Sequence, residues 1–203
     1  MPMNNESVFD PEHQITHLES KIVVALERIA ESFRVALWQE SKENKLSPIQ
    51  IQILIFLLFH SNEKCKVSYL AQEFNMTKAT VSDAVKALNQ KKLISKHTDA
   101  GDSRSYEIHL TTEGKTVAQK ASAFAQPIAQ PLHTLSAEQK NVLYTSLLEL
   151  IHKLQQAGII SVQRMCFNCR FYKKQPDNHL CAFLDAKLQL DELRVDCAEF
   201  ESI

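Results

Sequence analysis

The chain contains little glycine, with three glycines among its 203 residues. A glycine-rich loop of the kind that cradles phosphate groups in nucleotide-binding enzymes is therefore excluded. The longest apolar run, residues 51–59, includes Gln52 and is far shorter than the roughly twenty residues that span a bilayer. The N-terminal residues 1–9 are polar and lack the basic start and apolar centre of a signal peptide. We therefore expect a cytoplasmic protein without a membrane segment.

Neither sign of charge predominates, because the formal net charge is −1 at pH 7. Near-neutrality neither requires nor excludes a nucleic-acid partner, so any basic surface must be local. The sequence also lacks internal repeats, low-complexity linkers and a recognisable nucleophile with its base and orienting group. We therefore expect a protein that is not an enzyme, with one good-sized core and a small appendage.

Three helices are expected to begin at capping residues, over about residues 10–43, 48–60 and 136–156. The first carries apolar residues at steps of three and four, which makes it a long amphipathic helix. The second is apolar on nearly every side and is expected at the centre of the domain. A further helix is expected from Thr111 toward Ala129, interrupted by Pro127 and Pro131.

The middle of the chain has the outline of a helix-turn-helix followed by a hairpin. The expected helices and strands are a short strand at 66–67, helices over 69–74 and 78–91, and strands over 93–98 and 106–110. Gly101 lies between the last two strands and supplies the turn of the hairpin. A hairpin after a helix-turn-helix is a wing.

Two short segments carry a family resemblance. They are Thr80-Val81-Ser82 in the second helix of the helix-turn-helix, and Asp102-Ser103-Arg104 in the wing ahead of Leu110-Thr111-Thr112-Glu113-Gly114. On these segments, residues 45–156 resemble the MarR family of bacterial winged-helix regulators. The resemblance implies a mainly α fold with a small β-wing, whose long N- and C-terminal helices intertwine in a homodimer. It also implies a sequence-specific transcriptional regulator, with repression as the expected action.

The second helix of the helix-turn-helix is expected to read double-stranded DNA. Thr77 can cap this helix, and its outward side chains are Lys78, Thr80, Ser82 and Lys86. These ammonium and hydroxyl groups suit phosphates and base edges in a major groove. The basic face is extended by Lys91, Lys92 and Lys96. Asp83 stands where the family often carries a basic residue, and whether it excludes phosphate or accepts a hydrogen bond from cytosine stays open.

The wing supplies two further candidate DNA-binding residues. Arg104 can enter a minor groove, and Asp102 is placed to orient its guanidinium, as the matching residues do in the family. The apolar stripe of the first helix is too long for a small winged domain to cover, so we expect a homodimer. Two-fold protein symmetry then predicts a pseudo-palindromic operator.

Four of the five cysteines are concentrated near the C-terminus, at Cys166, Cys169, Cys181 and Cys197. Clustered cysteines in a reducing cytoplasm are more often metal ligands or redox centres than disulfides. Four thiolates suit either tetrahedral zinc or an iron-sulfur cluster. Zinc ribbons usually offer two tight pairs, whereas here only Cys166 and Cys169 are close in sequence. Unligated thiols are the third alternative.

Residues 165–200 resemble the cluster-binding region of high-potential iron-sulfur proteins. They share a close cysteine pair, an aromatic step at Phe171-Tyr172 and two separated cysteines, although the spacings differ. The resemblance implies that the four cysteines ligate a [4Fe-4S] cluster, from which neighbouring aromatic residues exclude water.

We therefore expect a winged-helix DNA-binding and dimerisation domain over residues 1–160 and a small four-cysteine metal module over 161–203. An iron-sulfur cluster would make the protein a sensor of redox state, nitric oxide or iron. Zinc would make the module a structural staple of a regulator that responds to an unknown small molecule. A rival hypothesis is a redox or electron-transfer protein that uses the winged domain only for dimerisation. The remaining cysteine, Cys65, is either an oxidant-sensing thiol or inert packing.

Overall fold

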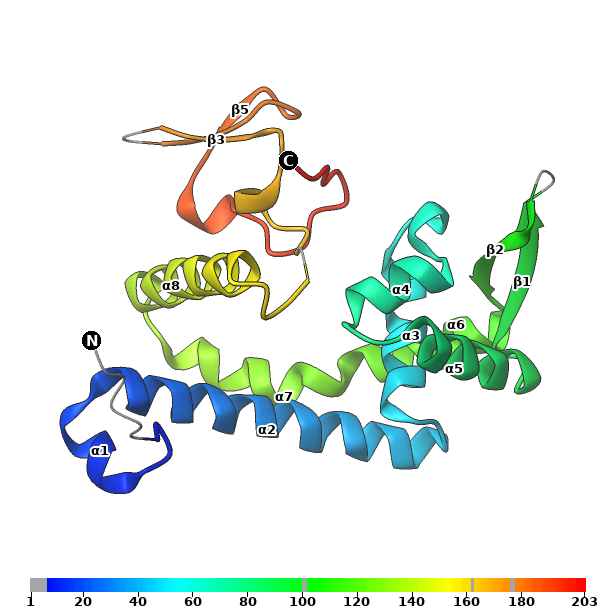
Figure 1. The fold of residues 1–203 in the computed structure, drawn as a ribbon, viewed down its shortest axis with the longest axis horizontal. Coiled ribbons are helices and arrows are strands. Elements are labelled where there is room, and N and C mark those ends of the chain that lie inside the picture. Colours follow the sequence, from blue (N-terminus) through cyan, green and yellow to red (C-terminus); the bar gives the residue numbers. More distant parts are fainter. Residues whose placement is uncertain (1–6, 100–101, 162, 176–177) are drawn as a thin grey trace.

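The computed structural model describes residues 7–99, 102–161, 163–175 and 178–203. Helices predominate, and the described strands form a two-stranded hairpin in the middle of the chain and a three-stranded sheet near its C-terminus. Figure 1 shows a long helical arm, residues 11–44, that runs from the N-terminal side to a helical unit bearing the hairpin, while the C-terminal module lies on the other side of the picture from this hairpin. The mainly helical fold with a small antiparallel hairpin agrees with the sequence-based prediction.

The single N-terminal helix predicted over 10–43 is instead two helices, α1 (Pro11–Thr16) and α2 (Leu18–Asn44). His17 between them has an extended backbone, with φ −112° and ψ 107°. Its ring Nδ1 lies 2.9 Å from the carbonyl oxygen of His13. The ring thus forms a hydrogen bond with a carbonyl at the end of α1, where the last carbonyls lack partners within the helix. A side-chain hydrogen bond of this kind leaves no trace in the apolar periodicity, which continues across the break.

Helix α3 (Pro48–Phe59) lies at the centre of the main core, as its apolar sequence predicted. Ile51, Ile53 and Leu54 on this helix are fully buried. The helix contacts α2 and elements of the helix-turn-helix and hairpin described next. At its start, the side-chain oxygen of Gln50 accepts a hydrogen bond from the backbone N–H of Ser47 at 3.0 Å, as a capping box predicts.

A helix-turn-helix follows, formed by α4 (Val67–Glu73) and α5 (Lys78–Gln90). The prediction of a strand at 66–67 is wrong, because Lys66 is the N-cap of α4. The neighbouring Cys65, which ends the short 3₁₀ helix η1 (Asn62–Lys64), accepts a backbone hydrogen bond from Ile108 at 2.9 Å. Residues 67, 70 and 71 all pack on the main core at helical spacing, so tertiary packing favours a helix over a strand.

The hairpin consists of β1 (Ile94–Asp99) and β2 (Asp102–Leu110), which pair antiparallel with Ile94 opposite Leu110. The second strand begins at Asp102, earlier than the predicted start at Tyr106. The register shifts between Thr98 and Asp99, and the pair of Asp99 with Asp102 beyond this irregularity extends the strand past the alternating segment. Gly101, the predicted turn residue, lies outside the described residues.

The helix predicted from Thr111 toward Ala129 is divided. Its parts are α6 (Thr112–Ala121), the 3₁₀ helix η2 (Ser122–Ala125), α7 (Gln126–Ala129) and the 3₁₀ helix η3 (Gln130–Thr134). Pro127 and Pro131 fall in the first turns of α7 and η3, where a helix can do without their missing N–H donors. The predicted interruption is therefore present, and these segments run alongside α2 in Figure 1.

The last helix, α8 (Ala137–Gln156), matches its predicted bounds and begins with a capping box at Ser136. Its buried residue Leu148 belongs to a second apolar cluster, apart from the main core. The other buried members of this cluster are Met165, Leu188 and Leu193. Helix α8 therefore shares a core with the C-terminal residues.

The C-terminal module lies over α8 (Figure 1). Its elements are the 3₁₀ helix η4 (Cys166–Asn168), strands β3 (Tyr172–Lys174), β4 (His179–Cys181) and β5 (Ala186–Leu188), and the 3₁₀ helix η5 (Leu190–Glu192). The strands form an antiparallel sheet in the order β3-β4-β5. The module is thus a small meander held against a helix by one apolar cluster.

The helical arm leaves a long apolar face uncovered. The exposed large apolar residues of α1 and α2 are Ile15, Leu18, Ile22, Val23, Ile29, Phe33, Val35 and Trp38. The buried residues of α2 are two serines, Ser20 and Ser41.

No helix in the described part of the chain has the length and apolarity needed to cross a membrane.

Candidate DNA-reading helix and cysteine pocket

Helix α5 is built to present one polar face to solvent. Thr77 caps it, since its Oγ1 accepts a hydrogen bond from the backbone N–H of Thr80 at 3.1 Å. The inner stripe is buried and consists of Val81, Ala84, Val85 and Leu88. All four side chains predicted to project outward are exposed, namely Lys78, Thr80, Ser82 and Lys86, and so is Asp83. The helix therefore offers ammonium and hydroxyl groups, together with one carboxylate, to an approaching surface.

A hollow lies beside this face, between the start of α4, the start of α5 and strand β2. It has a volume of about 490 Å³, and its polar lining includes Lys66, Ser68, Lys78 and Ser82. Two ammonium groups and two hydroxyls in one hollow suit the oxygens of a phosphate. The sequence analysis missed Lys66 and Ser68, because it assigned Lys66 to a strand.

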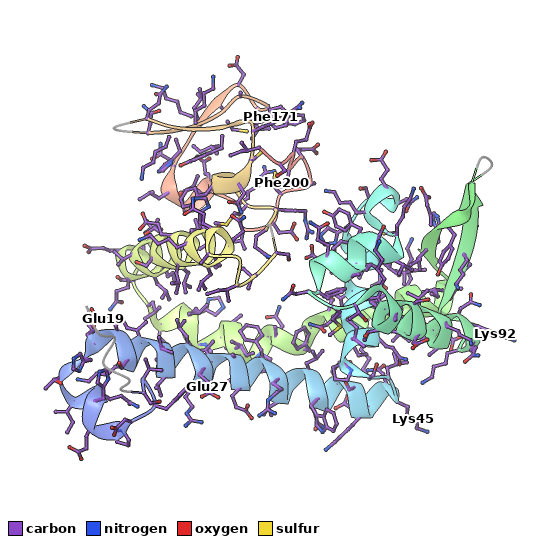
Figure 2. The ribbon with its side chains drawn as sticks, viewed as in Figure 1. Glu19, Glu27, Lys45, Lys92, Phe171 and Phe200 are labelled. Carbon is purple, nitrogen blue, oxygen red and sulfur yellow. The ribbon has the colours of Figure 1, made fainter. Side chains whose placement is uncertain are left out.

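Two of the lysines expected to extend the basic face make contacts within the chain. Lys91 Nζ donates to the backbone carbonyl of Lys45 at 2.5 Å. Lys96 Nζ lies 4.4 Å from the centroid of the Tyr106 ring. Lys92, which Figure 2 labels at the far end of α5, has a left-handed backbone with φ 58°. Lys91 therefore helps to fasten α5 to the end of α2.

The wing residues Asp102 and Arg104 lie in strand β2. Their side chains lie outside the described part of the structure. The predicted roles of Arg104 in a minor groove and of Asp102 in orienting it therefore stay predictions.

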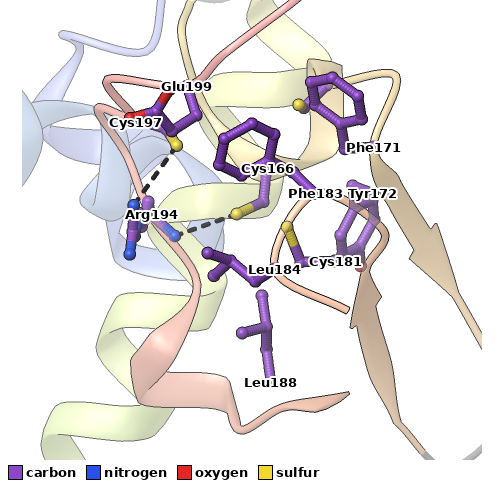
Figure 3. A pocket seen from close by; sticks show the side chains of 11 residues that line it. Cys166, Phe171, Tyr172, Cys181, Phe183, Leu184, Leu188, Arg194, Cys197 and Glu199 are labelled. Carbon is purple, nitrogen blue, oxygen red and sulfur yellow. Dashed lines mark hydrogen bonds between the residues drawn. The ribbon is translucent and has the colours of Figure 1, made fainter. Parts of the chain in front are cut away.

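The four C-terminal cysteines line one pocket, although they come from separate parts of the module. Its volume is about 30 Å³, and its walls include Cys166, Cys169, Cys181 and Cys197. Figure 3 shows the sulfurs of Cys166, Cys181 and Cys197 turned toward a common space, with the rings of Phe171 and Phe183 beside them. The fold thus brings together all four cysteines that the sequence analysis predicted as ligands.

Hydrogen bonds and burial shape the thiols of this pocket. The backbone N–H of Arg194 donates to Cys166 Sγ at 3.2 Å, and its guanidinium donates to Cys197 Sγ at 3.6 Å. Burial raises the pKa of Cys166, the nearby cysteines raise it further, and the backbone N–H of Arg194 acts in the opposite direction. Positive and N–H groups next to sulfur favour the thiolate form that binds metals.

Aromatic rings surround the sulfurs. The ring centroids of Phe171 and Phe183 are 5.4 Å apart, and those of Phe167 and Tyr172 are also 5.4 Å apart. The Tyr172 hydroxyl lies 2.6 Å from Nδ1 of His179. Burial, followed by the charge of Cys166, raises the pKa of Tyr172 to about 12, so this hydroxyl remains protonated at neutral pH.

The module is joined to the helix-turn-helix by a buried arginine that the sequence analysis missed. Arg164, which is 7% exposed, forms ion pairs with Glu73 of α4 and with Asp196. Burial lowers the pKa of Arg164, but hydrogen bonds to Asp196, Glu73 and Tyr69 outweigh it, so the pKa lies above its usual value. No local pattern indicates this residue, because its partners are distant in sequence.

Cys65 has the character of a packing residue. Its side chain is buried, and its thiol donates to the carbonyl of Ser61 at 3.3 Å. Burial, and then the charge of Glu107, raise its pKa to about 11. A thiol that stays protonated at neutral pH is a poor nucleophile, which favours inert packing over oxidant sensing.

These elements define a winged helix-turn-helix protein with a four-cysteine pocket in its C-terminal module. The model of the MarR family matches residues 44–105. The HTH-type transcriptional repressor YetL of Bacillus subtilis (strain 168) is 28% identical over 110 residues, which cover 54% of this chain and 66% of YetL. The family match thus includes the helix-turn-helix and ends before the cysteine segment.

Solved structures share the fold. The complex of Staphylococcus aureus MepR with DNA has a TM-score of 0.58 and 24% identity, covering 65% of this chain and 97% of that chain. A MarR transcriptional regulator from Methanosarcina mazei Go1 has a TM-score of 0.57 and 17% identity, covering 67% and 97%. These likenesses confirm the winged-helix fold. The support for a MarR-type transcriptional regulator comes from the family match and from YetL.

The named relatives are transcriptional regulators, which are not enzymes, and this confirms the expectation that the chain is not an enzyme. Because the family match ends at residue 105, it does not reach the cysteine segment. The likeness of residues 165–200 to high-potential iron-sulfur proteins stays a prediction.

Proposed function

We propose that the chain is a DNA-binding transcriptional repressor of the MarR type. The observation that carries the proposal is α5, whose inner stripe is buried while its polar side chains are exposed. The relatives support it, since YetL is named a transcriptional repressor and MepR was solved as a complex with DNA. In a winged helix-turn-helix the second helix enters the major groove, which places α5 against the base edges.

The chemistry of α5 divides the work of binding. Lys78 and Lys86 neutralise phosphates and fix the register on the duplex, and so does Lys66, which shares a hollow with Lys78. The short hydroxyls of Thr80 and Ser82 approach the base edges without a long, flexible side chain. Asp83 is exposed on the same face and accepts hydrogen bonds only, so it favours cytosine over bases that present acceptors.

The protein acts in this proposal as a homodimer. The exposed apolar side chains of α1 and α2 recur along the whole arm, and they include the large residues Phe33 and Trp38. A second copy related by a two-fold axis would cover this face with an identical face. Two copies of α5 would then meet successive major grooves of a pseudo-palindromic operator.

We further propose that the four cysteines hold an iron-sulfur cluster of the [4Fe-4S] type. Zinc binds sulfur at about 2.3 Å, so four thiolates around one ion lie close together. Among the described residues, no group of three or more His, Cys, Asp or Glu is placed to hold a metal ion. All four cysteines nevertheless open onto one pocket, so one centre can draw on all four thiolates, and the likeness of residues 165–200 to high-potential iron-sulfur proteins favours a cluster over a single zinc ion.

The surroundings of the pocket support the same group. The N–H donors of Arg194 reach two of the sulfurs, and hydrogen bonds to sulfur tune the potential of iron-sulfur centres. Phe171 and Phe183 limit the access of water. When bound, a cluster supplies sensitivity to oxidants, nitric oxide and iron supply, and DNA binding would follow its state.

DNA binding is tested by titrating DNA from upstream of the protein's own coding sequence, at several salt concentrations. Lys86→Ala is expected to weaken binding and to reduce the slope of log K against log salt by about 0.9 for each phosphate that is no longer neutralised. Lys140→Ala is the matched control, because Lys140 is an exposed lysine on α8, away from the DNA-reading face. Equal salt slopes for the wild type and Lys86→Ala would remove α5 from the proposed interface.

The metal centre is tested by iron, zinc and acid-labile sulfide analysis of protein purified without oxygen. Brown protein with iron and sulfide, and their loss in Cys181→Ser, would support the cluster. Colourless protein with one zinc per chain would overturn it and make the module a structural staple.

A further inference from the structure

The junction between the cysteine module and the helix-turn-helix is a charged network around one buried side chain. The guanidinium of Arg164 contacts both oxygens of Glu73, with Nη2 at 3.2 Å from Oε1, and also lies 3.4 Å from the Tyr69 hydroxyl. Both partners lie on α4. On its other side, Nε donates to Asp196 Oδ1 at 2.8 Å. Arg164 therefore bridges α4 to the residue that precedes Cys197.

Further contacts tie the same two parts together. His60, at the end of α3, places Nε2 3.0 Å from Asp196 Oδ2 and 3.1 Å from Arg164 Nη2. Lys64 Nζ donates to the carbonyl of Ala198 at 2.9 Å. Phe200, labelled in Figure 2, lines a pocket with Arg164 and residues of α4. The segment around Cys197 thus rests directly on the DNA-reading unit.

The main chain of Arg164 is hydrogen-bonded to the cysteine pocket, while its side chain contacts α4. The backbone N–H of Cys197 donates to the Arg164 carbonyl at 2.9 Å, and that of Cys166 donates to the Arg194 carbonyl at 3.0 Å. The segments that carry Cys166 and Cys197 are therefore paired beside Arg164. A shift of Cys197 therefore acts on Arg164 twice. It moves the N–H that donates to the Arg164 carbonyl, and it moves the neighbouring Asp196, which pairs with the guanidinium.

We propose that Arg164 is the positioning residue through which the cysteine pocket sets the orientation of α4, and thereby of α5. This inference rests on the proposed function. A buried guanidinium needs its carboxylate partners, so displacement of Asp196 leaves Glu73 as the single carboxylate in contact with it. Glu73 is the last residue of α4, shortly before Thr77 caps α5. Loss of one carboxylate partner of Arg164 thus changes the contacts of Glu73, next to the turn between α4 and α5.

The coupling acts within one subunit and does not require a change in the dimer. Helices α4 and α5 pack directly on each other, so a shift at Glu73 changes the angle at which α5 meets the groove. When the pocket holds a cluster and Cys197 is fixed as a ligand, the contacts of Arg164 with Asp196 and Glu73 hold α4 and α5 in one orientation. When the pocket is empty, Asp196 is no longer held beside Arg164, and operator affinity changes.

The test compares wild type with Glu73→Gln, which keeps the shape of the side chain but removes the charge that pairs with Arg164. Glu201→Gln is the matched control, because it removes a carboxylate that pairs with Arg170 at 2.8 Å and leaves both ion pairs of Arg164 in place. Each protein is prepared with iron and sulfide, and again after removal of iron by a chelator. Operator affinity and hydrogen exchange of the amides of residues 67–74 are measured in both forms.

In wild type, and separately in Glu201→Gln, operator affinity is expected to differ at least about fivefold between the iron-loaded and the iron-free protein. In both proteins, removal of iron is expected to speed hydrogen exchange in residues 67–74. Glu73→Gln is expected to retain its iron but to bind within about twofold in the two forms, with fast exchange in both. If Glu73→Gln does not fold, Arg164→Lys, which keeps the charge but loses the fork that joins two carboxylates, is expected to give the same loss of coupling.

The possible failures are distinct. If iron-loaded and iron-free wild type bind the operator equally, the proposed sensing function fails and the coupling fails with it. If wild type discriminates and Glu73→Gln discriminates equally, the proposed function stands and the route through Arg164 is overturned. Unchanged exchange in residues 67–74 of wild type on iron removal would also overturn this route.

Discussion

Replacing Gly114 with alanine is expected to push α6 away from the start of the wing and to destabilise the fold. A Cβ at this position would lie 1.8 Å from the carbonyl oxygen of Leu93, whereas non-bonded heavy atoms rest about 3.5 Å apart. Helix α6 or the start of the wing would therefore have to move by more than about 1 Å. That movement acts on two hydrogen bonds, from Thr111 N to the Leu93 carbonyl at 3.1 Å and from Thr111 Oγ1 to the Lys92 carbonyl at 2.8 Å.

The expected loss follows from these contacts. Overpacking in a well-packed site costs about 1–3 kcal/mol, and each weakened hydrogen bond contributes about 1 kcal/mol. The free energy of unfolding should therefore fall by about 3–5 kcal/mol in Gly114→Ala, a large share of the usual 5–15 kcal/mol.

Urea unfolding followed by circular dichroism measures this loss. Gly158→Ala is the matched control, because Gly158 has a left-handed φ of 71° but no atom within 4 Å of an added Cβ. Backbone strain alone should cost this control about 1 kcal/mol. The reasoning is refuted if Gly114→Ala is no less stable than Gly158→Ala.

Three further changes test other parts of the structure. Raising the pH from about 9 to about 11 should lower the free energy of unfolding by about 2 kcal/mol. The reason is that the Cys65 thiol, with its pKa raised to about 11, ionises less readily in the folded than in the unfolded chain. Cys65→Ala should lose this part of the pH dependence. Ser136→Ala removes the acceptor for Gln139 N at 3.2 Å and should cost about 1 kcal/mol in urea unfolding. Phe183→Ala, which opens the cysteine pocket, should speed the loss of visible absorbance of iron-loaded protein in air, whereas Phe59→Ala, outside that pocket, should not.

Local signals predicted the DNA-reading half well. Thr77 caps α5 by accepting a hydrogen bond from the backbone N–H of Thr80, three residues on. The buried apolar residues of α5 recur at helical spacing, so both features are visible in the sequence. Figure 1 agrees with the predicted helix-turn-helix and hairpin in order and kind. The strand expected at 66–67 failed, because packing on the core decided that segment.

The convergence of the cysteines was predicted from their number and concentration, but their supporting residues were not. Arg164 meets Glu73 across 91 positions of the chain, and no periodicity links residues so far apart. The break at His17 depended on one ring nitrogen and one carbonyl. Such contacts are products of the finished fold, and a single sequence carries no mark of them.

The apolar cluster shared by α8 and the C-terminal module limits how the chain can be divided. Leu148 is 1% exposed, and Met165, Leu188 and Leu193 complete its surroundings. A protein ending after α8 would leave this side of the helix wet and open to aggregation. Helix α8 and the module therefore form one packing unit, and neither can be removed without exposing the apolar side chains of the other.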